Sequence, residues 1–197
     1  MKVAEFRTHS INRTCTKKYK NYKSYDMALS KDFSKRCGYC NIKESTIAPV
    51  SFQVDHFIPQ KAFKGVRDDL LCDYDNLVWS CPKCNRAKSN QFDGILTKKQ
   101  ATNTLFIKPD EEDYNKYLYR NEMGGIGAYD KVGIDLIARL KLFRIIHAYA
   151  WAYEQLEDII QRANDGSLKI KLEQLNKLYQ NKDRIKNALN EAYKLNK

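Results

Sequence analysis

The pattern of apolar and polar residues predicts two short strands and a helix in the middle of the chain. Residues 51–54 and 77–79 are short runs of β-branched and aromatic side chains, which are typical of strands. A helix is expected from Pro82 to beyond Lys88, because proline is favoured in the first turn of a helix. A short helix is also expected just before Cys37, and residues 123–127 indicate a hairpin or loop.

In the last third of the chain, the apolar residues recur with the period of a helix. From about Asp130 to Ala163 apolar residues recur at spacings of three and four, which predicts one long helix. Gly166 is a candidate C-terminal stop and Ser167 a candidate N-cap for a second helix with the same pattern. We expect these two helices to form an antiparallel hairpin.

The length of 197 residues suggests one domain, or one domain with an appendage. We divide it into a basic N-terminal segment (1–36), a central core (37–128) and the helical hairpin (129–197). The chain has no apolar stretch near the length of a membrane span. We therefore expect no membrane partner and a soluble, cytoplasmic protein.

The net charge of +11 is unevenly distributed. Residues 1–36 carry ten Lys and Arg against three acidic residues, and residues 167–197 carry eight against three. The middle is nearly neutral, with seventeen against eighteen. Basic ends around a neutral middle suit a polyanion, although lysine-rich ends are equally common as solvated surface.

Two Cys-x-x-Cys pairs give the strongest chemical signal. Cys37/Cys40 and Cys81/Cys84 can place four thiolates around one Zn²⁺, and no secretion signal favours disulfides instead. Buried thiols or a redox pair are the alternatives. Four sulfur ligands close the coordination shell, so the zinc is expected to be structural. A catalytic metal would need other ligands.

Between and beside these pairs lie Asp55-His56, Asn76 and Asn85. With the cysteine pairs, this arrangement resembles the HNH endonucleases, the ββα-metal nucleases whose signature letters are His, Asn and His or Asn. The resemblance implies an α+β, mainly helical fold: a ββα-metal core stapled by a four-cysteine zinc site, followed by the C-terminal helical hairpin. The expected activity is hydrolysis of DNA phosphodiester bonds.

The resemblance also implies roles for each letter. His56 would be the general base that deprotonates water, which suits an imidazole that titrates near neutrality. Asp55 and the side-chain oxygen of Asn85 would hold a catalytic divalent cation. One carboxylate and one amide oxygen fit Mg²⁺ or Mn²⁺. Asn76 would orient the loop that carries the base.

Contacts to nucleic acid are expected from basic residues near the motif. Arg86 and Lys88 follow Asn85 on the motif helix, and Lys61 and Lys64 lie in the interval between His56 and Asn76. That interval is either a substrate-contacting loop or a solvated insertion.

A looser resemblance continues beyond the motif. The layout looks like bacterial HNH proteins that include nuclease subunits of Septu-type anti-phage systems, which act beside an ATPase subunit. It implies that the C-terminal helices dock a partner subunit; packing on the nuclease core or homo-oligomer formation are the alternatives. Two other functions stay open: a zinc-stapled nucleic-acid-binding module, and a nuclease that is silent until a partner arrives.

Overall fold

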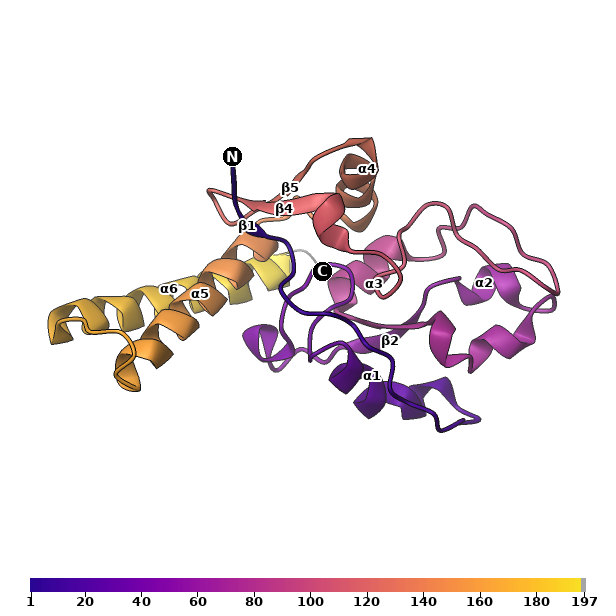
Figure 1. Cartoon of the computed structure of the whole chain (residues 1–197), viewed down its shortest axis with the longest axis horizontal. Helices are drawn as coiled ribbons and strands as arrows, with labels where there is room; N and C mark the ends of the chain where they lie inside the picture. The colour runs from indigo at the N-terminus through magenta and orange to yellow at the C-terminus, as the bar shows by residue number, and fades with distance from the viewer. Residues whose placement is uncertain (196–197) are drawn as a thin grey trace.

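Two small antiparallel sheets organise the chain in the computed structural model, which describes residues 1–195 (Figure 1). The strands are β1 (Lys2–Glu5), β2 (Gln53–His56), β3 (Leu77–Ser80), β4 (Leu118–Asn121) and β5 (Ile126–Ala128). The α-helices are α1 (Asp26–Asp32), α2 (Gln60–Phe63), α3 (Pro82–Lys88), α4 (Lys131–Leu140), α5 (Ile146–Asn164) and α6 (Leu172–Leu195). Short 3-10 helices are η1 (Tyr22–Tyr25), η2 (Glu44–Ile47), η3 (Asp68–Leu71), η4 (Tyr74–Asn76) and η5 (Tyr114–Lys116).

The central unit has the order strand, strand, helix, which confirms the prediction. β2 pairs with β3 in a regular antiparallel register in which Asp55 lies opposite Val78 and His56 opposite Leu77. Helix α3 follows β3 directly, with Pro82 in its first turn. β2 begins two residues later than the apolar run suggested, because its bounds are set by pairing with β3.

The N-terminal segment is built into the fold. β1 pairs with β4, and β4 continues into β5 through the hairpin expected near residues 123–127. The segment that follows β1 is tied down by Arg13, whose guanidinium bonds the Asp110 carboxylate at 2.6 Å. The Thr14 hydroxyl donates to the Asp32 carboxylate at the end of α1, also at 2.6 Å. Backbone pairing and an ion pair therefore cross the boundary between the predicted N-terminal segment and the central core.

The single helix predicted from Asp130 to Ala163 is two helices. α4 ends where Lys141 adopts a left-handed backbone conformation with φ of 54°. The Leu142 N–H then bonds the Ile137 carbonyl at 2.9 Å, in the Schellman arrangement that terminates helices. The apolar pattern runs on because Leu142 and Ile146 enter the same core as α4. The expected hairpin therefore consists of α5 and α6 alone.

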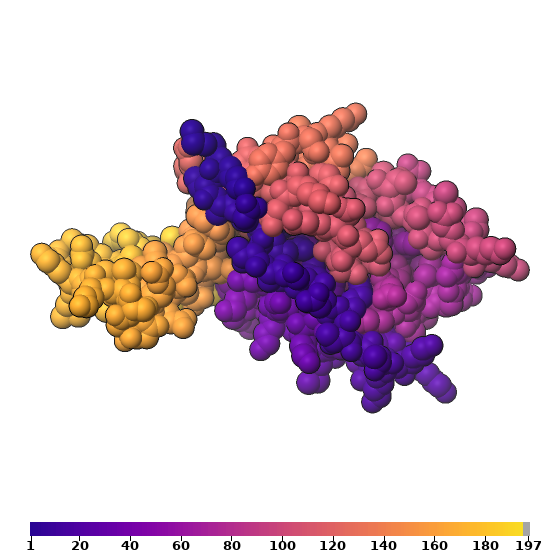
Figure 2. Space-filling view, viewed as in Figure 1, coloured from indigo at the N-terminus to yellow at the C-terminus, as the bar shows by residue number. Residues whose placement is uncertain are grey.

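The α5–α6 hairpin extends away from the rest of the molecule as an arm (Figures 1 and 2). The sequence predicted that the second helix begins directly after Ser167, but α6 begins at Leu172. The Ser167 hydroxyl donates to the Arg162 carbonyl and so stabilises the turn. Near the other end of the arm, Leu189 of α6 is fully buried in the core. Within residues 1–195 no helix combines the length and apolar character needed to cross a membrane.

Glu154 connects α5 to the segment that carries the first cysteine pair. Its carboxylate accepts hydrogen bonds from the Arg36 guanidinium at 2.6 Å, the Lys43 backbone N–H at 3.1 Å and the Thr46 hydroxyl at 3.0 Å. The side chain is only 15% exposed. One carboxylate thus satisfies three donors of residues 36–46 and holds the root of the arm against the core.

We predict that Glu154→Ala lowers the free energy of unfolding by about 2–4 kcal/mol, because three partly buried donors lose their acceptor. The matched control is Asp158→Ala, one turn further along α5, whose only ion pair within residues 1–195 is the exposed one with Arg162. That control should change stability by less than about 0.5 kcal/mol. Urea unfolding monitored by circular dichroism measures both; equal effects would contradict the connecting role of Glu154.

Candidate metal centre and active site

The four cysteines of the two pairs converge on one point. The sulfur atoms of Cys37, Cys40, Cys81 and Cys84 all lie within 4.8 Å of one another, and all four residues are buried. Burial opposes ionisation of the Cys37 thiol, but hydrogen bonds from the other three thiols hold its pKa well below the usual value. A buried cluster of four thiols is the donor set of a structural zinc site.

Local backbone geometry brings the two pairs together. The first pair lies in a tight turn closed by the Cys37 N–H, which bonds the Ile42 carbonyl at 2.9 Å. The next N–H, of Gly38, bonds the Trp79 carbonyl on β3 at 2.8 Å. A Cβ at Gly38 would lie 2.7 Å from the Phe33 ring, so only glycine allows this approach. The second pair lies at the start of α3, with Cys81 as its N-cap residue.

Two buried arginines surround the cysteine cluster without a carboxylate partner in the described part of the chain. Arg7 donates to the carbonyls of Gly38 and Pro109, and Arg120 donates to those of Gly124, His147 and Cys40. Burial lowers the pKa of Arg120 to about 10, so it stays charged at neutral pH. Four thiolates and one divalent ion would carry two negative charges in total. The two guanidinium groups supply the matching positive charge.

Asp55 and His56 lie on opposite faces of the β2–β3 hairpin. The strand is regular through both residues, and side chains of successive strand residues alternate in direction. Asp55 therefore faces the side of the hairpin that packs on α3. His56 faces the side covered by η1 and α2, where its ring centroid lies 4.6 Å from that of Tyr22 and 5.7 Å from that of Phe63.

The Asp55 carboxylate is buried and fully engaged. It accepts a hydrogen bond from the Tyr39 hydroxyl at 2.6 Å and an ion pair from the Lys88 ammonium at 3.1 Å. Burial raises the pKa of Asp55, an effect that Lys88 and Tyr39 oppose. The Lys88 ammonium also donates to the His56 carbonyl at 2.6 Å.

This placement corrects the sequence prediction for Lys88. Its side chain is 0% exposed, so the ammonium cannot reach a phosphate of bound nucleic acid while it holds Asp55. A lysine on a helix is normally a surface residue, and only the approach of β2 to α3 buries this one. Lys88 instead stabilises the buried carboxylate and the strand end at His56.

His56 has one defined tautomer. Nε2 lies 2.9 Å from the Leu71 carbonyl oxygen, which can only accept, so Nε2 carries the proton. Nδ1 therefore presents its lone pair, and the Gln60 side-chain amide donates to it at 3.2 Å. Burial lowers the pKa of His56, an effect that the Leu71 hydrogen bond and Asp55 oppose. The neutral form has a basic nitrogen at a fixed position.

Asn76 is buried behind the loop that carries His56. Its side-chain oxygen accepts from the Ile58 N–H at 2.9 Å, and its amide donates to the Leu70 carbonyl at 3.1 Å. One side chain therefore ties the segment after His56 to the residue before Leu71. These bonds fix the positions of the two segments that lie next to His56 and Leu71.

Asn85 lies on the same face of α3 as Lys88, one turn earlier. Its side-chain amide donates to the Gln53 side chain at 2.8 Å, and Gln53 is two residues before Asp55 on the same face of β2. The two expected metal ligands thus border one interface between β2 and α3, each bonded to a different partner. Arg86, Lys61 and Lys64 are exposed, as a nucleic-acid contact requires.

Three side chains at the site were not singled out from the sequence for these roles. Gln60 contacts the imidazole of His56, Tyr39 contacts Asp55, and the Tyr22 ring packs on His56. The position of Tyr39 between the two cysteines of the first pair could have drawn attention to it. No local pattern points to Gln60, because its role depends on the turn from β2 into α2.

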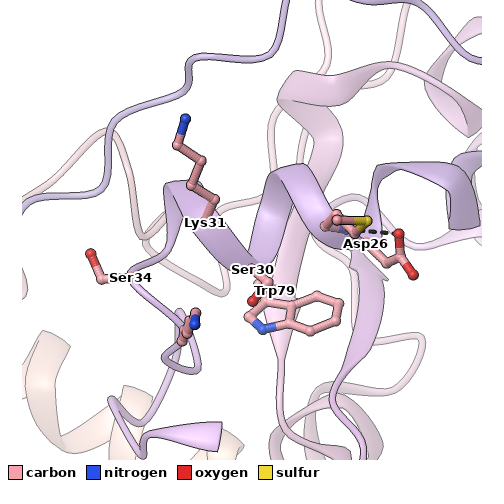
Figure 3. Close-up of a pocket in the computed structure, with 7 residues that line it drawn as sticks. Asp26, Ser30, Lys31, Ser34 and Trp79 are labelled. Atoms are coloured by element: carbon pink, nitrogen blue, oxygen red, sulfur yellow. Dashed lines mark hydrogen bonds between the residues drawn. The ribbon is translucent and has the colours of Figure 1, made fainter.

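A separate hollow of about 590 Å³ lies beside α1, where Trp79 forms one wall (Figure 3). Ser30, Lys31 and Ser34 surround it, and the hydroxyl of Ser30 donates to the Glu44 carboxylate at 2.7 Å. None of the predicted catalytic residues lines this hollow. The catalytic groups are therefore arranged by packing around the hairpin and not by this pocket.

We predict that the purified protein contains about one zinc ion per chain, because the four buried thiols form one closed donor set. Cys84→Ser should lose this metal and lower the melting temperature. The control Cys72→Ser changes a cysteine outside the cluster and should keep it. Elemental analysis by mass spectrometry decides the question; equal zinc content in both variants would contradict the site.

We also predict that Lys88→Met lowers the free energy of unfolding by about 3–5 kcal/mol, because it leaves the buried Asp55 carboxylate without its cation. Arg86→Met removes an exposed charge from the same helix and should change stability by less than about 0.5 kcal/mol. Urea unfolding compares the two. Equal stability of both variants would show that Lys88 does not hold Asp55.

Comparison with known proteins agrees with this geometry. Residues 37–91 match a family model described as HNH endonuclease. The chain is also similar to the Septu protein PtuB of Bacillus mycoides (strain KBAB4), with 28% identity over 115 residues. That match covers 49% of this chain and 38% of the relative, so it spans well under two thirds of the relative's length. No solved structure matches the chain significantly.

The matched residues include both cysteine pairs, the β2–β3 hairpin and helix α3. The family match, the Septu relative and the four-cysteine cluster all agree with the resemblance seen in the sequence. Residues 37–91 of this chain are therefore an HNH endonuclease family domain.

Proposed function

We propose that the protein is a metal-dependent endonuclease that hydrolyses DNA phosphodiester bonds, with His56 as the general base. The observation that carries the proposal is the hydrogen bond from His56 Nε2 to the Leu71 carbonyl. It leaves Nδ1 unprotonated, so that this atom can accept a proton from a water molecule. Asn76 holds both neighbouring loop segments and so keeps the imidazole in place.

The catalytic cation would be held by Asp55 and Asn85, whose oxygen atoms suit Mg²⁺ or Mn²⁺. Such a cation supplies positive charge to a phosphate oxygen and to the leaving oxygen. Asp55 is free to serve only when the Lys88 ammonium, 3.1 Å from its carboxylate, withdraws. Because Asp55 and His56 lie on opposite faces of β2, the strand must also bend there for both to act on one phosphodiester. The four-cysteine zinc would have no catalytic part; it holds α3, and hence Asn85, against the hairpin.

A biological role in anti-phage defence follows from the similarity to a Septu protein. We propose that the chain acts in the cytoplasm as the nuclease component of such a system, beside an ATPase subunit. The α5–α6 arm is the part that extends beyond the nuclease core and offers surface for that subunit (Figure 2).

A second candidate is a nuclease that is silent until a partner or substrate rearranges it. The specific observation is that every polar catalytic group is already bonded within the chain. Lys88 holds Asp55, Gln60 holds His56 Nδ1, and Gln53 holds Asn85. A zinc-stapled binding module without catalysis is the remaining alternative, but it needs none of these side chains.

We predict that the protein nicks or linearises supercoiled plasmid with Mg²⁺ or Mn²⁺ and not without added divalent metal. His56→Ala should reduce the cleavage rate by about 10²- to 10⁴-fold, since it removes the base. His9→Ala is the control, because His9 makes no contact with the site in the described structure, and it should cut like wild type. Circular dichroism and zinc content confirm that each variant is folded.

The outcomes separate the candidates. Full cleavage by His56→Ala would rule out His56 as the base. No cleavage by any variant, with zinc bound and the fold intact, would favour the silent nuclease or the binding module. Restoration of cutting by an added partner subunit would then select the silent nuclease.

A further inference from the structure

The N-terminal segment crosses the face of the hairpin that carries His56. Tyr22 of η1 places its ring edge-on to the imidazole, with centroids 4.6 Å apart and planes inclined by 65°. This segment lies outside residues 37–91, which match the HNH family model. The candidate base is therefore covered partly by a part of the chain that the family domain does not include.

Hydrogen bonds fix this segment to the loop that orients His56. The Tyr25 hydroxyl donates to the Cys72 carbonyl at 3.3 Å, and the Cys72 thiol donates to the Lys20 carbonyl at 3.2 Å. Cys72 follows Leu71, whose carbonyl holds the imidazole. Tyr25 also accepts from the Tyr19 N–H at 3.0 Å, which closes the segment on itself. The backbone of residues 19–25 is thus anchored beside the base.

The anchored segment leaves positive charge uncompensated. Lys20 and Lys23 are exposed, and neither forms an ion pair with any residue of the described chain, 1–195. Three lysines of α6 differ, because Lys177, Lys182 and Lys194 each pair with a glutamate.

The neighbouring lysines of the segment are less suited to an anion. Lys17 and Lys18 line a hollow of about 570 Å³ together with Asp69, Asp73 and Asp75. Those carboxylates supply negative charge on that side. Lys20 and Lys23 do not line the hollow, so the attraction for an anion is expected to centre on them.

A second basic element, α2, also contacts His56. Phe63 of α2 lies with its ring centroid 5.7 Å from that of His56. The same short helix and its end carry Lys61 and Lys64, which are exposed and likewise make no ion pair within residues 1–195. The imidazole therefore contacts two elements, η1 and α2, and Lys20 and Lys23 on or beside the first and Lys61 and Lys64 on or beside the second form no ion pair within residues 1–195.

We propose that η1 and the residues before it form a binding site for the sugar–phosphate backbone, with Lys20 and Lys23 as its phosphate contacts. A strand bound there lies over η1 on the face that carries His56, where Lys61 and Lys64 of the neighbouring α2 region can contact it as well, and brings a phosphodiester toward His56. This inference rests on the proposed nuclease function for its substrate, but binding at Lys20 and Lys23 is measurable without cleavage. Ammonium groups bind phosphates through charge, so the site holds nucleic acid of any sequence.

The test compares Lys20→Ala/Lys23→Ala with the matched control Lys169→Ala/Lys171→Ala. The control removes the same charge from two exposed lysines in the connection at the tip of the arm. Fluorescence anisotropy measures the affinity of each for a labelled duplex oligonucleotide and for one of its single strands. No divalent metal is added, which prevents metal-dependent cleavage while the four-cysteine site keeps its tightly held metal.

The Lys20/Lys23 variant should bind at least about 10-fold more weakly at ~0.1 M salt, and its plot of log affinity against log salt should be shallower by about 2. The control should match wild type in both. Equal affinities of the two double variants, or no binding by wild type, would overturn the site. Loss of binding by the Lys20/Lys23 variant, in a protein that never cuts, would keep the site and leave the silent nuclease or the binding module as its function. Cutting by wild type, with equal affinity of the Lys20/Lys23 variant, would reject the site and keep the nuclease.

Discussion

The convergence of four buried thiols is the interaction on which the rest of the structure depends. It joins the turn at Cys37 to the first turn of α3, two segments that are separated by the whole β2–β3 hairpin. The two buried arginines reinforce the junction, because their donors bind carbonyls around it and their charge would complement the thiolates of a metal-bound cluster. A helix fixed in this way can present Asn85 and Lys88 to β2 at set positions.

The regular register of β2 then divides the candidate site between two faces of one hairpin. The α3 face holds Asp55 in contact with Lys88 and Tyr39, and the other face holds His56 against Tyr22. The two faces are connected through the Lys88 ammonium, which bonds both the Asp55 carboxylate and the His56 carbonyl. A movement of the Lys88 ammonium away from this position would break both contacts, so the environments of Asp55 and of the strand end at His56 are coupled.

Local sequence signals predicted the elements that local energetics decide. Proline in the first turn of α3, the β-branched run in β3 and the spacing of the cysteine pairs each act within a few residues. The break at Lys141 escaped prediction because the apolar pattern continues through it into the same core. The pairing of β1 with β4 could not be predicted either, because Lys2 and Asn121 are brought together by folding and not by sequence proximity.

The sequence by itself determined the chemistry of the candidate site: four thiols in two pairs, a carboxylate beside an imidazole, and two amides at the family spacing. Tertiary structure decided how those groups are engaged. From the sequence, Lys88 is expected on the basic surface of a helix, but the approach of β2 to α3 makes it the buried partner of Asp55. The tautomer of His56 depends on a backbone carbonyl fifteen residues away, at Leu71. A carbonyl is common to every residue and carries no signal in the sequence, so only the folded chain could assign this role.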